Sequence, residues 1–247
     1  MEPIRTSTES LWTRVDALLA RYDLLQHPFY QAWSAGELTH DQLAAYGAQY
    51  LPHVAAFPTY LTALHSRLPE GRARKAILAN AADEESHGRS HADIWRQFIA
   101  GMRAFDTDQP LGGSARESGP GAAGSDEVLP EIRELVSGYQ TIARDASLPT
   151  ALGAFYAYES QVPRVAASKL AGLKEHYSAD DASCEYFALH TTADVYHSKV
   201  WKSLIEDCVA GDPSCAAQVL SGAEEGARAL WRALDGIEAV RVKALSN

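Results

Sequence analysis

Cysteine is scarce in this sequence. Cys184, Cys208 and Cys215 are its three cysteines among 247 residues, and their spacing contains no Cys-x-x-Cys pair. An odd number of loosely spaced cysteines argues against the disulfide framework that holds many small secreted proteins together. We therefore interpret them as reduced thiols, buried or at the surface, and expect a cytoplasmic protein.

Long apolar runs are also lacking. No window approaches the roughly 20 apolar residues of a transmembrane helix, so we expect no membrane partner. Residues 1–23 contain four acidic side chains and no apolar stretch of the signal-peptide type. Positive charge is in deficit as well, because 22 Lys and Arg residues face 32 Asp and Glu residues and the net charge is −10. A chain this acidic repels phosphate backbones, which argues against a nucleic-acid partner.

Alternating strand patterns are missing, and helical periodicity takes their place. Hydrophobic residues make up 46% of the chain, enough for one large domain over residues 1–247. The segment 106–127 is rich in glycine, proline and serine and is predicted to be a flexible surface loop. The sequence therefore predicts an all-α protein, with helices over 11–25, 39–57, 59–66, 71–87, 91–102, 130–146, 149–173, 182–210 and 213–245.

Two local signals refine this prediction. Thr39 is a suitable cap for the N-terminus of a helix. Pro52 and Pro58 are expected to kink or end the helix that begins there, because proline lacks the N–H group that a helix interior uses.

The stretch 187–197 contains three residues of metal-ligand type. His190, Asp194 and His197 are separated by steps of four and three, so on one continuous helix they project from the same face. Two imidazoles and a carboxylate suit iron, manganese or zinc better than calcium or magnesium.

More ligands of this type lie upstream. Glu84 and His91 are seven residues apart and share a face if the helix between them is continuous. Glu84 and His87 also form the Glu-x-x-His motif of helical di-iron proteins, so spacing alone does not decide between His87 and His91. Glu159 lies in an apolar, aromatic helix, where a buried carboxylate is costly unless something positive pairs with it.

Each of these features also has an ordinary interpretation. A run of acids such as 83–85 is usually a solvated helix face, and Glu159 could pair with Arg164 or Lys169. The combination of three carboxylates and three imidazoles in one all-helical chain instead favours a site for two metals.

Several further segments carry a family pattern, namely residues 27–33, 36–39, 42–46, 65–67, 83–85, 91–98, 158–163 and 193–197. The segment 158–163 and the triplet at 190, 194 and 197 are the specific motifs among them. In these residues the chain resembles the haem-oxygenase-like di-metal oxidases, in particular the CADD-like para-aminobenzoate synthases. TenA and PqqC relatives share the fold but lack this set of metal ligands.

The resemblance implies a haem-oxygenase-like (TenA/PqqC-like) bundle of about seven or more helices, and a homodimer. Its Glu-x6-His pattern favours His91 over His87. It also implies two metal ions, Fe/Fe or Mn/Fe, with O2 and a reductant as co-substrates. The ligands it implies are Glu84, His91, Glu159, His190, Asp194 and His197.

The resemblance also implies an unusual reaction. Relatives close to CADD are implicated in making para-aminobenzoate for folate biosynthesis from a tyrosine of their own chain. Here that tyrosine is Tyr30, with Tyr46 as a second tyrosine near the site and Lys169 as the amine donor. On sequence alone, the tyrosines are ordinary core aromatics and the lysine an ordinary exposed helix residue.

Two other functions remain open at this point. A di-iron oxygenase could act on an external small molecule such as a fatty acid, an amino acid or an amine. A non-enzymatic partner-binding or regulatory protein would have no use for six converging ligands. A zinc hydrolase is disfavoured, because catalytic zinc usually takes three protein ligands.

Overall fold

The protein is an α-helical bundle, as the sequence predicts. The computed structural model describes residues 2–85, 88–105 and 127–246, and no strand occurs in these ranges. The elements are α1 (Glu2–Arg21), the 3-10 helix η1 (Leu24–Gln26), α2 (Pro28–Ser34), α3 (His40–Ser66), α4 (Arg72–Glu85), α5 (His91–Ala104), α6 (Pro130–Asp145), α7 (Leu148–Glu159), α8 (Val162–His176), α9 (Asp181–His190), α10 (Ala193–Gly211) and α11 (Cys215–Leu245). The predicted loop 106–127 lies outside the described residues apart from Glu127.

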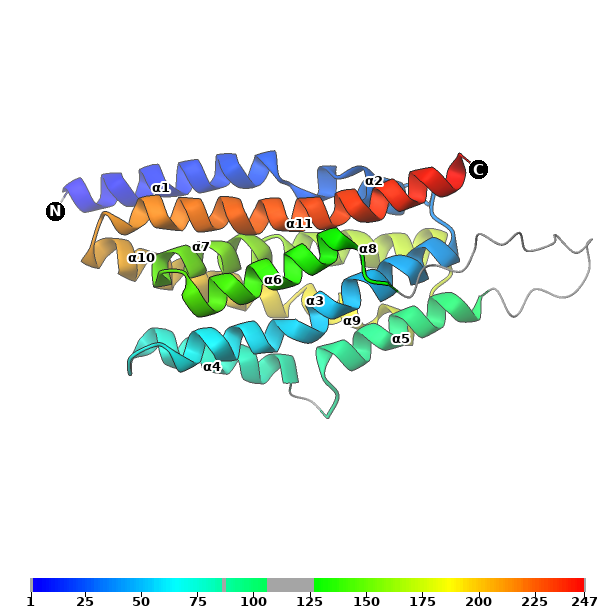
Figure 1. Ribbon diagram of the computed structural model, residues 1–247, viewed down its shortest axis with the longest axis horizontal. Helices are drawn as coiled ribbons and strands as arrows, with labels where there is room; N and C mark the ends of the chain where they lie inside the picture. Colours follow the sequence, from blue (N-terminus) through cyan, green and yellow to red (C-terminus); the bar gives the residue numbers. More distant parts are fainter. Residues whose placement is uncertain (1, 86–87, 106–126, 247) are drawn as a thin grey trace, which may run out of the picture.

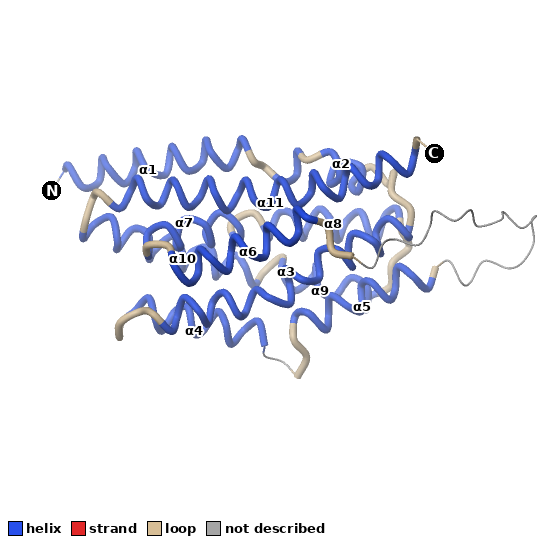
Figure 2. The backbone as a smooth tube through the Cα atoms, in the orientation of Figure 1, coloured by secondary structure: helices blue, strands red, loops and turns tan. Residues whose placement is uncertain are grey.

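The long helices run along one axis of the molecule. Figure 1 shows α11 spanning most of its length, with α1 beside it and the two chain ends at opposite ends of the bundle. Figure 2 shows the same arrangement, in which α4 and α5 follow one another along the lower edge. Helix α11 packs on α7, α6 and α1, and α3 packs on α4, α5 and α6. The metal-type residues predicted from the sequence lie on helices inside this bundle.

Helices α7 and α11 approach each other closely because glycines line their contact. A Cβ atom added to Gly222 would lie 1.9 Å from the carbonyl oxygen of Thr150, and one added to Gly153 would lie 2.1 Å from that of Val219. Side chains of any size would force these backbones apart. Close packing here fixes α7, the helix that ends at Glu159.

Helix α3 runs through both of its prolines, so the prediction that Pro52 or Pro58 ends it is wrong. Thr39 caps its N-terminus with a reciprocal capping box, in which Thr39 Oγ1 accepts from Gln42 N and Gln42 Oε1 accepts from Thr39 N. Twelve of the 27 residues of α3 are buried, and the helix packs on α4, α5 and α6. This packing outweighs the cost of roughly 3 kcal/mol that each internal proline carries.

Two stretches predicted as single helices are each split. The stretch 149–173 divides between α7 and α8, because Pro163 cannot donate to the carbonyl of Glu159 and its ring would clash with it. Pro163 instead occupies the first turn of α8. The stretch 182–210 divides at Thr191 and Thr192, whose hydroxyls donate to the carbonyl oxygens of residues 188 and 189 and compete with the helix backbone.

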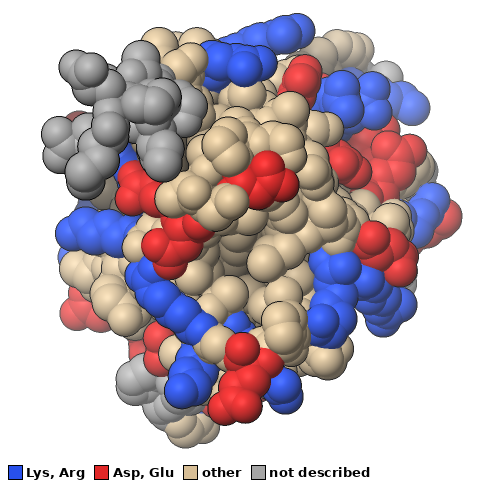
Figure 3. Space-filling model, turned by 90° about the vertical axis from the view of Figure 1, so that its left-hand side faces the viewer, with Lys and Arg blue, Asp and Glu red and all other residues tan. Residues whose placement is uncertain are grey.

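Charges of both signs share the surface at the bundle end that lies on the left of Figure 1. Figure 3 views the molecule from that side and shows Lys and Arg side chains interspersed with Asp and Glu. One of the surface ion pairs joins Arg72 of α4 to Asp207 of α10. Among the described residues, no helix has the length and apolarity that crossing a bilayer requires.

Candidate metal centre

Three of the predicted ligands meet where α4 and α9 end and α5 begins. Glu84, His91 and His190 are each at most 5% exposed, and one ligand atom of each lies within 4.8 Å of the others. The Nδ1 atom of His91 lies 2.7 Å from a carboxylate oxygen of Glu84. The Nδ1 atom of His190 donates to the carbonyl oxygen of Tyr186 at 2.7 Å, which leaves Nε2 available to a metal.

The other three predicted ligands meet where α7 ends and α10 begins. Glu159, Asp194 and His197 are buried to the same degree, and their ligand atoms also lie within 4.8 Å of one another. His197 Nδ1 lies 3.4 Å from Asp194 and 3.5 Å from Glu159. On the far side of the same ring, Nε2 lies 3.1 Å from Asp83. The Asn80 amide donates to both carboxylate oxygens of Glu159, at 2.9 and 3.2 Å.

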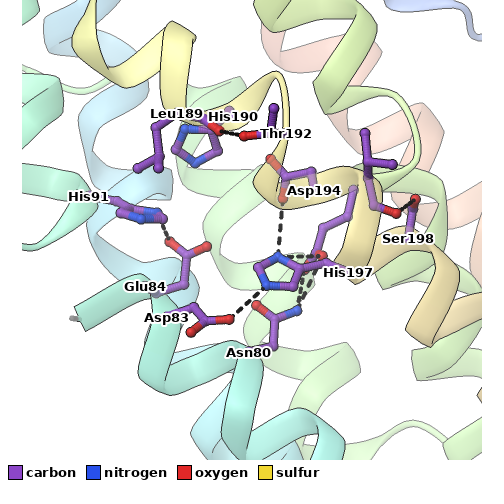
Figure 4. Close-up of polar contacts among 12 residues, drawn as sticks. Asn80, Asp83, Glu84, His91, Leu189, His190, Thr192, Asp194, His197 and Ser198 are labelled. Carbon is purple, nitrogen blue, oxygen red and sulfur yellow. Dashed lines mark hydrogen bonds and ion pairs between the residues drawn. The ribbon is translucent and has the colours of Figure 1, made fainter. Parts of the chain in front are cut away.

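The two triads face a common space. A small pocket is lined by Glu84 and His190 from the first triad and by Asp194 from the second. Figure 4 shows these groups converging from α4, α9 and α10. The arrangement therefore offers two adjacent places for a metal ion, each surrounded by imidazole and carboxylate groups.

The structure corrects how these residues come together. His190 belongs to one triad, and Asp194 and His197 belong to the other. The reason is that α9 ends at His190 and α10 begins only after Thr191 and Thr192. A single continuous helical face was therefore the wrong expectation for the triplet.

Glu84 and His91 lie on separate helices, so they do not share the face that one continuous helix would have given them. They nevertheless meet at the junction of those helices. His87, the alternative that spacing left open, lies outside the described residues.

Burial of three carboxylates calls for a compensating positive charge. Neither ordinary partner of Glu159 is used, since Arg164 pairs with Asp23 and Lys169 donates to tyrosine hydroxyls. Asp194 Oδ2 is buried and has no hydrogen-bond partner among the described residues. An unpaired buried acceptor is costly, and bound cations would satisfy it and neutralise the cluster. The donor set fits iron or manganese on this ground.

The pKa values of the second triad reflect the same crowding of charge. Burial raises the pKa of Glu159 above its ordinary value, and the Asp194 carboxylate raises it further. Burial alone would lower the pKa of His197, but its hydrogen bond to Asp194 and the charge of Glu159 raise it overall. Without metal, these groups hold protons that a metal ion must displace.

Tyr30, Tyr46 and Lys169 form a second buried cluster. Lys169 Nζ lies 2.8 Å from the hydroxyl of Tyr30 and donates to that of Tyr46 as well, and the two hydroxyls are 3.0 Å apart. Nζ also lies 4.1 Å from the centroid of the Tyr30 ring. Lys169 is only 6% exposed, and burial holds the pKa of its amine well below 10.5. These residues therefore depart from the ordinary exposed lysine and separate core tyrosines.

This cluster lies beside the triads. It borders a second pocket, which shares three lining residues, Tyr158, Val162 and Tyr186, with the pocket at the triads. Of these, Tyr186 stacks on the imidazole of His190 with ring centroids 4.0 Å apart. The amine and the two phenols thus stand one layer of side chains away from the candidate ligands.

Four residues at the site were not singled out as partners of the ligands from the sequence. Asn80 and Asp83 support Glu159 and His197 from α4, and Tyr186 supports His190. Gln161 bridges two backbone segments beside Glu159. Helical spacing could have indicated two of them, because Asn80 and Tyr186 each lie four residues before a candidate ligand.

A helical bundle with two buried carboxylate–imidazole triads has the architecture of a metal-dependent redox protein. The sequence profile of the iron-containing redox enzymes, a haem-oxygenase-like family, matches residues 44–231, and the chain belongs to this family. The resemblance seen in the sequence is thereby confirmed at the level of the family.

Individual relatives are more specific. The 4-aminobenzoate synthase of Nitrosomonas europaea is 35% identical over 241 residues, which cover 94% of this chain and 92% of that protein. The 4-aminobenzoate synthase of Chlamydia trachomatis is 36% identical over 223 residues, covering 90% and 89%. A TenA homologue from Pseudomonas syringae, 18% identical, superposes with a TM-score of 0.70 over 97% of this chain and 98% of its own. The haem-oxygenase-like fold predicted from the sequence is confirmed.

Proposed function

We propose that this chain is a di-metal, O2-dependent oxidase, with Fe/Fe or Mn/Fe at the two triads, that makes 4-aminobenzoate from its own Tyr30. Lys169 is the amine donor. One observation carries the proposal: a buried lysine nitrogen lies 2.8 Å from the phenol oxygen of Tyr30, next to six candidate metal ligands. The names of the relatives support the product, whose cellular use would be folate biosynthesis.

The geometry matches the atoms that must move. Tyrosine carries a hydroxyl and Cβ at para positions of its ring, and 4-aminobenzoate carries an amine and a carboxylate there. The conversion breaks the Cα–Cβ bond of Tyr30, oxidises Cβ to the carboxylate and leaves a hydrogen at Cα. It also breaks the Cε–Nζ bond of Lys169, leaving Cε oxidised to an aldehyde, and forms a ring C–N bond in place of the phenol C–O bond, whose oxygen leaves as water. O2 is the oxidant, and an external reductant supplies the remaining electrons.

Burial prepares Lys169 for this role. A neutral amine has a free electron pair for bond formation, whereas an ammonium group has none. Because the pKa of Lys169 lies well below 10.5, the neutral form is present at a lower pH than for an exposed lysine. The hydroxyls of Tyr30 and Tyr46 hold the nitrogen beside the ring carbon where the new bond forms.

Tyr46 completes the arrangement around the reacting ring. Its hydroxyl contacts both other members of the cluster, and its own ring packs edge-to-face against that of Tyr30. These contacts fix the orientation of the phenol, and they make Tyr46 a candidate relay for hydrogen or electrons.

Metals held at the triads would supply electrons to O2 and oxidising equivalents to the cavity. The protein's own part is to hold these ligands in place, exclude water and keep Tyr30 within reach. Asp83 and the Tyr186 carbonyl orient His197 and His190 by bonding their second nitrogens.

The test uses protein labelled with ring-labelled tyrosine and nitrogen-labelled lysine. After iron or iron and manganese loading, exposure to O2 and reductant should release doubly labelled 4-aminobenzoate, at most one molecule per chain. Peptide mass spectrometry should show loss at Tyr30 and Lys169. The variant Tyr30→Phe should form no product, and Tyr22→Phe serves as the control.

Unchanged masses at Tyr30 and Lys169, with no 4-aminobenzoate released, would contradict the proposal. Oxidation of an added small molecule by both the wild type and Tyr30→Phe would instead indicate an oxygenase with an external substrate. Metal analysis showing fewer than about one ion per chain after loading would favour a non-enzymatic protein.

A further inference from the structure

Gln161 connects the end of the metal-bearing helix α7 to the segment that carries Tyr30. It lies between α7 and α8, two residues after Glu159, and its side chain is 1% exposed. Its Nε2 donates to the carbonyl oxygen of Ala157 at 3.1 Å, and its Oε1 accepts from the backbone N–H of Leu24 at 3.0 Å. Leu24 N can only donate and Ala157 O can only accept, so both ends of the amide are specified.

The Leu24 backbone begins a short, well-anchored segment. Asp23 accepts from Leu25 N and pairs with Arg164 of α8. His27 caps α2 by accepting from Phe29 N, and its other ring nitrogen contacts Asp235 of α11 at 3.2 Å.

Tyr30 stands in the first turns of α2, six residues after Leu24. The segment is therefore tied to α11 at one end and to α7 at the other. The Leu24 side chain itself lines the cavity that holds Tyr30 and Lys169, together with Val162 of α8.

We propose that Gln161 is a positioning residue for the proposed self-conversion, on which this inference rests. By joining Leu24 to Ala157, its amide fixes the Tyr30 segment relative to Glu159 and the rest of the second triad. Capping α7 alone would need only the bond to Ala157 O. The second bond crosses to η1, which lies 137 residues earlier in the chain.

The variant Gln161→Met tests this role, because methionine has a similar length and cannot make either hydrogen bond. Hydrogen exchange at the Leu24 amide, measured with and without metal, should become faster. Metal content should stay as in the wild type, and O2 consumption should continue. The yield of 4-aminobenzoate per O2 consumed should fall by about 10- to 100-fold, as for a reacting group misplaced by an ångström.

Two further variants sharpen the comparison. Gln161→Glu, when its buried carboxyl is protonated, can still accept from Leu24 N and donate to Ala157 O, so it should restore protection and yield. Gln26→Met changes an exposed glutamine of η1, the 3-10 helix that begins at Leu24, and should behave as wild type. If Gln161→Met binds less metal, Gln161→Asn takes its place, because its amide is one methylene too short to reach both backbone groups.

The positioning role is overturned if the product yield per O2 stays at the wild-type value, or if exchange at Leu24 does not change. Both results require a wild type that forms 4-aminobenzoate. A wild type that forms none shows instead that the proposed function is wrong, and the positioning role is then wrong with it.

Discussion

Burial lowers the pKa of both Lys169 and His53, with different consequences. Both pKa values are lowered because an apolar surrounding disfavours the protonated form. Lys169 has tyrosine hydroxyls around its nitrogen, so its neutral amine is held in a defined position. Both nitrogens of His53 are buried among aromatic rings, and neither has a hydrogen-bond partner in the part of the chain that the structure describes. The lysine is therefore suited to react through its nitrogen, and the histidine, which is buried and has no such partner among the described residues, destabilises the folded chain.

Replacement of Lys169 by arginine should abolish the formation of 4-aminobenzoate. Arginine is always positively charged in proteins, so it offers no free electron pair. Metal content should be unchanged, since Lys169 is not among the candidate ligands. Product assays and metal analysis check this, with Lys202→Arg as the control at an exposed position. Product from Lys169→Arg would show that the amine comes from elsewhere.

His53 should make the metal-free protein sensitive to acid. Its pKa is about 3 in the folded chain against an ordinary value of 6.5, so the unfolded chain binds a proton first as the pH falls. The effect of His53 on the free energy of unfolding is therefore constant above pH 6.5. Below pH 6.5, the free energy of unfolding falls by about 1.4 kcal/mol per pH unit because of this residue.

The substitution His53→Phe removes this pH dependence, because phenylalanine does not bind a proton. Urea unfolding of both proteins between pH 7 and pH 5 should give free energies of unfolding that diverge as the pH falls, with the variant more stable. Parallel curves would show that His53 is hydrated or paired in solution.

For individual residues, the sequence predicted which side chains come together but not how they divide between the two triads. All six candidate ligands were named from residue type, spacing and family resemblance, and the structure brings them into two triads. The division between triads depends on breaks between helices, which ligand spacing does not reveal. The role of Gln161 was also out of reach, because it depends on contact with Leu24, far away in sequence.

Proline has opposite effects on two helices of this protein. Pro163 separates α7 from α8, whereas Pro52 and Pro58 lie inside α3. Local propensity is the same in both cases. The difference comes from tertiary packing, because α3 is buried against α4, α5 and α6 over its length. Helix existence was therefore predictable from periodicity, but helix boundaries were not.

Gly222→Ala should destabilise the protein. The added Cβ would lie 1.9 Å from the carbonyl oxygen of Thr150, so α7 and α11 must move apart. We expect a loss of about 1–3 kcal/mol in the free energy of unfolding, as for other overpacked sites.

Gly138→Ala, in α6, is the matched control. No atom of the described residues would lie within 4 Å of its added Cβ, and alanine should stabilise that helix by about 0.5–1 kcal/mol. Urea denaturation measures both changes. Equal effects from the two substitutions would show that the α7–α11 contact yields easily.

At the scale of the whole molecule, the triads join five helices, namely α4, α5, α7, α9 and α10. Metal bound at these positions should stabilise the folded chain, because the unfolded chain does not offer the preformed triads. With free iron at 100 times its dissociation constant, we expect about 2.7 kcal/mol of stabilisation for each site.

Anaerobic thermal unfolding with and without iron measures this effect. The rise in melting temperature should shrink in Asp194→Asn and persist in Glu225→Gln, which changes an exposed acid on α11. An equal rise in both variants would place the bound metal elsewhere.

The junction between α9 and α10 at Thr191 and Thr192 also bears on the order in which the two metal ions bind. His190 on one side of the break and Asp194 on the other serve different triads, so ordering either triad fixes the short junction that both share. Filling of the two positions should therefore be cooperative. Native mass spectrometry during an anaerobic iron titration should show empty and doubly loaded chains, with few singly loaded ones. A statistical distribution of the three species would show that each position fills independently of the other.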